Sequence, residues 1–170
     1  KLKALLRLRS FYSTSDLIVQ FKTHIWGIIE YSSGCICHIT SALSERLERL
    51  HRGFLRELGI SETTAFLQHN FPPPCFRRDV GLLGFLHKRT LGKCHPAHFE
   101  LLPDGVQYAG FHDKPLRSFV DECIYKHDAF RRSLFGYVLV YNRLPQEVID
   151  IIDVSRFQSF LTQVAMSRCR

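Results

Sequence analysis

The strongest constraint on the fold is an amphipathic run over residues 41–58. Its large apolar side chains recur three and four positions apart, which places them on one stripe of a helix. Ser41 can cap the start of this helix and Gly59 can end it. The pattern predicts a long helix that must cover its apolar side with other elements. The stripe consists of Leu43, Leu47, Leu50, Phe54 and Leu58.

Helical periodicity recurs on both sides of this run. Cap-forming residues at 13–16 precede a predicted helix over about 15–31. Ser61 begins a short helix that ends near Asn70, because three consecutive prolines follow at 72–74. A third long helix is expected over about 75–91, and Gly92 can close it.

The pattern fades after Gly92, where prolines and glycines divide the chain into short pieces as far as about Lys126. Periodicity returns at residues 130–141. Pro145 then opens a short helical turn, and Ser155 can cap a last helix. Strand signals of comparable strength are absent from the sequence.

We therefore predict an all-α protein, an irregular helical bundle with a helical C-terminal tail after a loop-rich connection. The expected segments are a basic bundle over 1–93, an irregular connection over 94–129 and a tail over 130–170. The short helices of the tail present more apolar surface than they can bury against one another. Their platform is either the neutral side of the N-terminal bundle or an upstream domain. We also expect Asn142 to fix the turn before Pro145 by bonding its own neighbouring backbone.

Charge is distributed unevenly along the chain. Residues 1–93 hold 14 Lys and Arg against 7 Asp and Glu, whereas residues 94–170 hold 9 against 9. The net charge of +7 therefore belongs to the first segment. A positive field attracts phosphate backbones, although solubility alone also explains such a charge. The longest apolar stretch, over residues 17–29, is interrupted by polar side chains, so no membrane-spanning helix is expected.

Three arginines of the 41–58 helix lie together on a helical wheel, almost opposite the leucine stripe. They are Arg49, Arg52 and Arg56, and we expect them to face solvent or a partner. A plainer interpretation is that Glu45 and Glu48, one turn earlier, pair with them and only stabilise an exposed helix.

A second group of cations belongs to the 75–91 helix, where only Asp79 supplies a carboxylate nearby. A cationic face with so few local carboxylates is the better candidate for binding phosphate groups. These cations are predicted to fall on one side of the helix. They are Arg77, Arg78, Lys88 and Arg89.

No motif indicates catalysis, a metal or a cofactor. Cys94 beside His95 is a conceivable nucleophile and base, but adjacent residues rarely align for proton transfer and no third group orients them. Two groups could hold zinc only if the fold brought them together, and we predict reduced thiols and no metal site. Trp26 is expected in the core of its helix bundle. The two groups are Cys35, Cys37 and His38, and Cys94, His95 and His98.

Three stretches in order resemble one known family. The block "RSFYSTSDLIVQFKTHIWGIIEYSSGCICHIT" followed by "LERLHRGFLRELG" is similar to the region after the catalytic palm of non-LTR (LINE-like) retrotransposon reverse transcriptases. "RRDVGLLGFLHKRTLGK" stands where that family has a helix of paired arginines and leucines. "FGYVLVYNRLPQEVIDIIDVSRFQSFL" resembles the family's closing motif. This chain departs from the family's pattern in having Tyr141 where Trp is usual, Arg143 before Leu144, and His51 where Gln is common.

The resemblance implies the thumb-like and C-terminal helical region of an RNA-directed DNA polymerase. That family holds its catalytic metals with paired palm aspartates, and this sequence contains no Asp-Asp pair. We therefore expect a nuclear or cytoplasmic segment without catalytic activity, which grips RNA or DNA backbone beside an upstream polymerase domain. A helical protein-interaction or structural module without nucleic-acid binding is the alternative. The expected backbone contacts are Arg49, Arg52, Arg56, Arg77, Arg78, Lys88 and Arg89.

Overall fold

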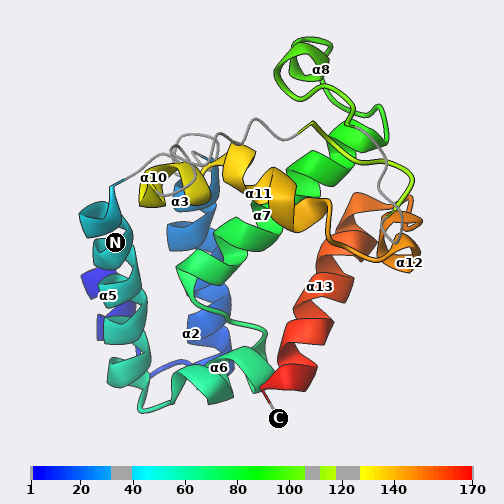
Figure 1. Ribbon diagram of the computed structural model, residues 1–170. Helices are drawn as coiled ribbons and strands as arrows, with labels where there is room; N and C mark the ends of the chain where they lie inside the picture. Colours follow the sequence, from blue (N-terminus) through cyan, green and yellow to red (C-terminus); the bar gives the residue numbers. More distant parts are fainter. Residues whose placement is uncertain (1, 32–39, 106–111, 118–126, 170) are drawn as a thin grey trace. The chain divides into compact units, whose positions relative to one another are not determined.

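The computed structural model describes residues 2–31, 40–105, 112–117 and 127–169. Within these ranges the chain is α-helical and has no β-strand, which confirms the predicted all-α class (Figure 1). An isolated antiparallel bridge joins Asp104 to Leu116. The backbone divides into two compact units, which we call unit 1 (Lys1–Arg78, with Cys169) and unit 2 (Asp79–Arg168, with Arg170).

Unit 1 begins with four helical segments: α1 (Leu2–Arg7), α2 (Thr14–Phe21), the π-helical η1 (Lys22–Trp26) and α3 (Gly27–Tyr31). The last three are continuous and confirm the predicted helix over about 15–31. Ser13 caps α2 in a reciprocal capping box, in which its hydroxyl accepts from the backbone N–H of Asp16 while the Asp16 side chain accepts from the backbone N–H of Ser13.

Helix α5 (Ser41–Leu58) confirms the strongest sequence prediction, with one correction at its start. Thr40, in place of the expected Ser41, is the cap, because its backbone is extended and its hydroxyl accepts from the Leu43 N–H at 3.4 Å. At the other end, Gly59 takes a left-handed conformation with φ of 69°. That conformation costs glycine little, so the helix ends where the sequence places its end.

Helices α6 (Glu62–His69) and α7 (Pro74–Thr90) also lie where the sequence places them. The Ser61 hydroxyl accepts from the Thr64 N–H at 3.0 Å and caps α6. Asn70 then turns the chain with φ of 46°, and Gly92 follows α7 with φ of 70°. Both are left-handed positions, which asparagine and glycine tolerate best.

The core of unit 1 is a cluster of aromatic rings from three parts of its chain. The Phe21 and Phe54 rings stack with centroids 4.3 Å apart, and the Trp26 and Phe71 rings stack at the same distance. Phe21 also meets Phe71 edge-on at 5.3 Å. These side chains are buried, which confirms the predicted core position of Trp26. Such ring pairs add to the free energy gained from burial alone.

The buried side of α5 is rotated from the predicted leucine stripe. Phe54 is fully buried, but Leu43 keeps 46% of its surface exposed, and His51 and Leu55 are buried in its place. The reason lies in what α5 packs against, because the aromatic rings of Phe21, Trp26 and Phe71 gather on the side of residues 51, 54 and 55. Periodicity alone does not contain that information.

Unit 2 contains most of α7, from Asp79 onward, and the later helices. These are α8 (Ala97–Leu101), α10 (Asp128–Arg131), α11 (Leu134–Tyr141), α12 (Gln146–Ile149) and α13 (Val154–Arg168). The expected helix over 130–141 is thus divided between α10 and α11. Asp153 takes the capping role expected of Ser155, because its carboxylate accepts from the Arg156 N–H at 2.7 Å.

The C-terminal tail packs on a platform within unit 2. Two of the buried platform residues, Leu83 and Leu86, come from α7. Leu83 and Leu86 belong to the predicted N-terminal segment 1–93, whereas Leu102 and Leu116 come from the predicted connection, which was not expected to contribute. The connection is therefore part of the core where it is described, although residues 106–111 and 118–126 lie outside the described ranges. The tail contributes Val138, Tyr141, Val148, Ile149 and Phe157.

Backbone contacts place the division between units inside α7, at Arg78 and Asp79. The predicted segments 1–93, 94–129 and 130–170 were drawn from charge, periodicity and the placement of proline and glycine, and they stay predictions. None of the helices in the described ranges is both long enough and apolar enough to cross a membrane.

Candidate nucleic-acid interface

Arg49, Arg52 and Arg56 project from the exposed side of α5. We call them the arginine row. All three are exposed, and the buried residues of the same helix, His51, Phe54 and Leu55, lie on its other side. Residues three and four apart on a helix are neighbours, so the row is continuous. With Gly53 it lines an open hollow in the surface.

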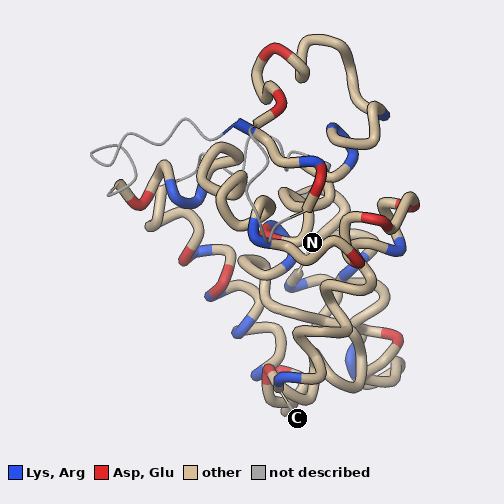
Figure 2. The backbone as a smooth tube through the Cα atoms, turned by 45° about the vertical axis from the view of Figure 1, so that its right-hand side comes forward, with Lys and Arg blue, Asp and Glu red and all other residues tan. Residues whose placement is uncertain are grey.

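Carboxylates as well as cations occur along α5 (Figure 2). These carboxylates do not form ion pairs with the arginine row. The Glu48 carboxylate instead accepts from the Cys75 N–H at 2.7 Å, at the start of α7. Free N–H groups at a helix start favour such an anion. No hydrogen bond or ion pair joins an arginine of the row to any of the described residues. The positive charge of this face is therefore not cancelled by close contacts.

The cations at the start of α7 are half-buried in unit 1. The Arg77 guanidinium lies over the Trp26 ring, 4.3 Å from its centroid, and thereby covers one face of the aromatic cluster. Cation–π contacts of this kind stabilise both partners and restrict the arginine. Arg78 is also half-buried and has partners within the chain. Arg77 and Arg78 are thus less available than the arginine row.

The two cations at the end of α7, in unit 2, differ from each other. Lys88 is exposed, whereas Arg89 keeps only 4% of its surface exposed. The Arg89 guanidinium forms an ion pair with Asp104 and lies over the Phe99 ring, 4.8 Å from its centroid. Arg89 therefore does not share an exposed face with Lys88, contrary to the expected arrangement. Asp104 lies 15 residues further on in a stretch without periodicity, so the sequence offers no signal for this pairing.

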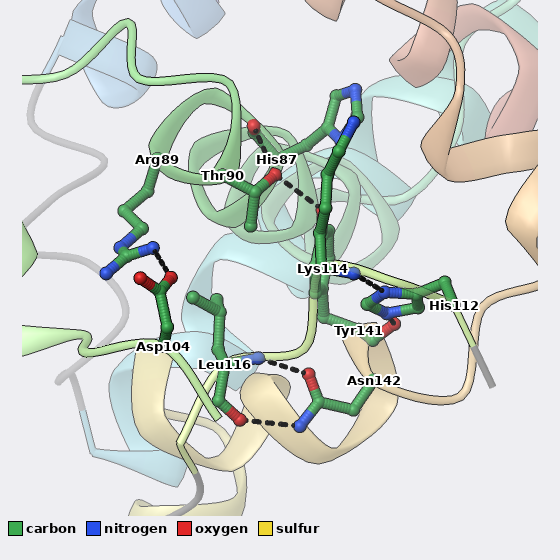
Figure 3. A network of polar contacts seen from close by, with 9 residues as sticks. All are labelled: His87, Arg89, Thr90, Asp104, His112, Lys114, Leu116, Tyr141 and Asn142. Atoms are coloured by element: carbon green, nitrogen blue, oxygen red, sulfur yellow. Dashed lines mark hydrogen bonds and ion pairs between the residues drawn. The ribbon is translucent and has the colours of Figure 1, made fainter. Parts of the chain in front are cut away.

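A buried polar network in unit 2 contains residues that sequence reasoning did not select (Figure 3). His87 Nε2 lies 2.6 Å from the Ile151 carbonyl oxygen, which can only accept, so this nitrogen carries a proton. His87 Nδ1 then accepts from the Tyr141 hydroxyl at 3.1 Å, and Thr90 Oγ1 lies 2.8 Å from the same hydroxyl. Burial lowers the pKa of His87 and raises the pKa of Tyr141 to about 12. Both groups are neutral near pH 7.

His112 and Asn142 fasten the connection to α11. His112 Nε2 donates to the Tyr141 carbonyl oxygen at 3.1 Å, and His112 Nδ1 accepts from the Lys114 N–H at 3.1 Å. Asn142 accepts from the Leu116 N–H at 3.0 Å and donates to the Leu116 carbonyl oxygen at 2.7 Å. Asn142 therefore bonds backbone 26 positions away, instead of its own neighbours as predicted. Burial lowers the pKa of His112 as well.

The described residues contain no group of three His, Cys, Asp or Glu side chains that could hold a metal ion. Cys35, Cys37 and His38 lie outside those residues. Cys94 is half-buried, and His95 Nδ1 accepts from the Ala97 N–H at 3.3 Å. The ring of His95 is thus turned toward its own backbone at the start of α8.

Comparison of the chain with protein-family models, with curated proteins and with solved structures finds no match. Of the seven predicted contacts, the three arginines of the row are the exposed group that the structure brings together without close carboxylate partners.

Proposed function

We propose that this chain is a non-catalytic, nucleic-acid-gripping segment of a non-LTR retrotransposon reverse transcriptase, which binds the template–primer backbone. The observation that carries the proposal is the arginine row of α5, exposed and without an ion pair to any described residue. Guanidinium groups suit phosphate oxygens because they present several donors in a fixed plane. Contacts to phosphate carry no sequence information, which fits a grip that must slide along a template.

The remaining predicted cations have graded roles in this proposal. Lys88 is exposed and available for phosphate contact. Arg77 and Arg78 are half-buried and contribute mainly to the local field. Arg89 is assigned a structural role, because its guanidinium is buried against Asp104 and Phe99.

The motif at the end of the chain has a structural role in this proposal. Tyr141 and Asn142, from the stretch that resembles the family's closing motif, bind His87, Thr90 and Leu116. Such contacts close the C-terminal region on α7. Catalysis would then belong to an upstream polymerase domain, which is the expected protein partner.

The proposal is tested by measuring the affinity for labelled DNA, RNA and RNA–DNA hybrid over a range of salt concentrations. In the variant Arg49→Gln, Arg52→Gln and Arg56→Gln combined, we expect the affinity to fall at least tenfold at low salt. The slope of log K against log salt should become shallower by about 2 to 3, because each phosphate that is no longer neutralised removes roughly 0.7 to 0.9 from it. Equal affinity and slope in the triple variant would contradict the proposal.

The matched control removes three exposed cations from unit 2. The combined variant Arg143→Gln, Arg156→Gln and Arg168→Gln loses the same net charge from positions that are also exposed. We expect this variant to keep most of the wild-type affinity. Equal losses in the two triple variants would mean that net charge, and not the arginine row, binds the polyanion.

A helical interaction module is the second candidate, because apolar side chains are exposed. Ile152 and Phe160 keep 70% and 40% of their surface exposed, beside a hollow that Lys93 and Arg156 also line. Apolar docking of a protein partner would persist at salt concentrations that release nucleic acid.

A further inference from the structure

Gly53 is in the middle of α5, between the arginines of the row, and packing does not explain it. Glycine destabilises a helix interior relative to alanine, because it loses more conformational freedom on folding. A Cβ added at Gly53 would meet no heavy atom within 4 Å. The fold would therefore accept a side chain here, and would be more stable with alanine.

Two other helical glycines of the described residues have packing reasons. A Cβ at Gly84 would lie 2.2 Å from the Gln158 side chain, and a Cβ at Gly136 would lie 2.5 Å from two backbone carbonyl oxygens. Gly81 shares the open surroundings of Gly53, and a Cβ at Gly27 would meet only the Lys22 carbonyl oxygen, at 3.9 Å. Gly53 differs from Gly81 in its setting, because it lines the same hollow as the arginine row.

One carboxylate next to Gly53 is already neutralised within unit 1. Glu57 lies one turn after Gly53 on the same helix, and its Oε2 accepts from Arg9 Nη1 at 2.7 Å. Both side chains of this pair are about half exposed, so the pair contributes little to stability. Its local effect is to offset the negative charge beside the hollow.

We infer that Gly53 is a seat at which the sugar–phosphate backbone of one nucleic-acid strand lies directly against helix α5, with its phosphates held by Arg49, Arg52 and Arg56. This inference rests on the proposed function and specifies its contact. The row rises by roughly 10 Å from Arg49 to Arg56, at about 1.5 Å per residue. Without a Cβ at Gly53, the strand approaches the helix backbone while the neighbouring guanidinium groups bind its phosphates.

Three variants at the seat and one elsewhere test the inference, with binding of a labelled single-stranded DNA, and separately of an RNA–DNA hybrid, as the readout. Gly53→Ala adds only the Cβ, and we expect the affinity to fall about threefold while the melting temperature rises. Gly53→Leu and Gly53→Gln fill the hollow, one with an apolar and one with a polar side chain. For both we expect the affinity to fall about tenfold, which corresponds to about 1.4 kcal/mol.

The control is Thr63→Leu, which adds an apolar side chain of the same size at an exposed helical position of unit 1. It should bind as wild type does. Circular dichroism and the melting temperature of each variant establish that it is folded, and leucine and glutamine are both better helix formers than glycine.

The outcomes separate this inference from the proposed function. If Gly53→Leu and Gly53→Gln bind as wild type while the arginine triple variant loses binding, the seat is overturned and the nucleic-acid grip stands. If the arginine triple variant also binds as wild type, the proposed function is contradicted, and the seat that rests on it is contradicted as well. If Thr63→Leu loses as much affinity as Gly53→Leu, surface apolarity is responsible and the seat is again overturned.

Discussion

Units 1 and 2 use the same residue types in opposite ways. In unit 1 the arginine row is exposed and forms no ion pair with a described residue, while aromatic rings fill the core. In unit 2 Arg89 is buried against Asp104, and two histidines, a tyrosine and an asparagine join segments of the core. The difference teaches that a cation or a histidine has no role by itself. Its role follows from what the fold places beside it.

The largest effect is expected for Phe54→Ala in unit 1. Phe54 is fully buried and stacks on Phe21, so its truncation should lower the free energy of unfolding by about 3 to 5 kcal/mol. Urea unfolding followed by the fluorescence of Trp26, the single tryptophan, reports on unit 1 directly. Leu47 is half-buried and should lose less. Leu43→Ala is the control, at a largely exposed position, and a change above about 0.5 kcal/mol there would contradict the observed rotation of α5.

The next largest loss of stability is expected in unit 2, at the buried contact between Asn142 and Leu116. Asn142→Ala removes two hydrogen bonds to buried Leu116 and leaves its N–H without a partner, which should cost about 1 to 3 kcal/mol. Faster hydrogen exchange over residues 134–141 should report the loss, with residues 43–58 unchanged. Gln146→Ala is the control, because Gln146 makes two hydrogen bonds to exposed Asp113 and one to exposed Asp150. Equal losses of stability in the two variants would mean that burial of the contact between Asn142 and Leu116 is unimportant.

Acid should weaken unit 1 through His51. Burial lowers the pKa of His51 from 6.5 to about 4, an effect that the Phe71 backbone partly offsets. Because the unfolded chain binds the proton more readily, stability is complete above about pH 6.5 and falls as the pH drops toward 4. Urea midpoints followed by Trp26 fluorescence should show this slope in the wild type and a flatter profile in His51→Phe. An unchanged slope in the variant would assign the acid sensitivity to other groups.

Unit 2 should show the same sign of pH dependence, because burial lowers the pKa of its histidines too and a hydrogen bond adds to the effect. The pKa values of His87 and His112 are lowered by burial. In addition, His112 Nδ1 accepts a hydrogen bond from the Lys114 N–H, and a proton on Nδ1 would break that bond. Stability is therefore lost as the pH falls below about 6.5. Hydrogen exchange at residues 134–141 over this range is the measurement. In His112→Asn the dependence should weaken, whereas in Gln146→Ala it should match the wild type.

The smallest expected effect concerns Glu57, beside the seat. Glu57→Gln removes a negative charge near the arginine row and should raise the affinity for nucleic acid about twofold to threefold at low salt. Arg9→Gln leaves Glu57 without its partner and should lower the affinity by a similar factor. Both changes should vanish at high salt. Changes of the same sign in the two variants would indicate a structural effect instead.

The sequence by itself determined where most helices begin and end. Caps such as Ser61, left-handed positions such as Gly59 and Asn70, and the prolines before α7 act through the local backbone, so local pattern is sufficient. The exposure of the arginine row also followed from periodicity, because a long amphipathic helix has only one side to bury.

Only the tertiary structure decided which contacts stabilise each unit internally. The rotation of α5 toward His51 and Leu55 depends on where Phe71 lies, and the burial of Arg89 depends on Asp104. Asn142 bonds Leu116, which no short-range rule predicts. Likewise, Glu48 accepts a hydrogen bond from the start of α7 instead of pairing with Arg52 one turn later. The arginine row is therefore left without this ion pair. These contacts join residues far apart in the chain, and the free energy that selects them comes from burial that exists only once the units are assembled.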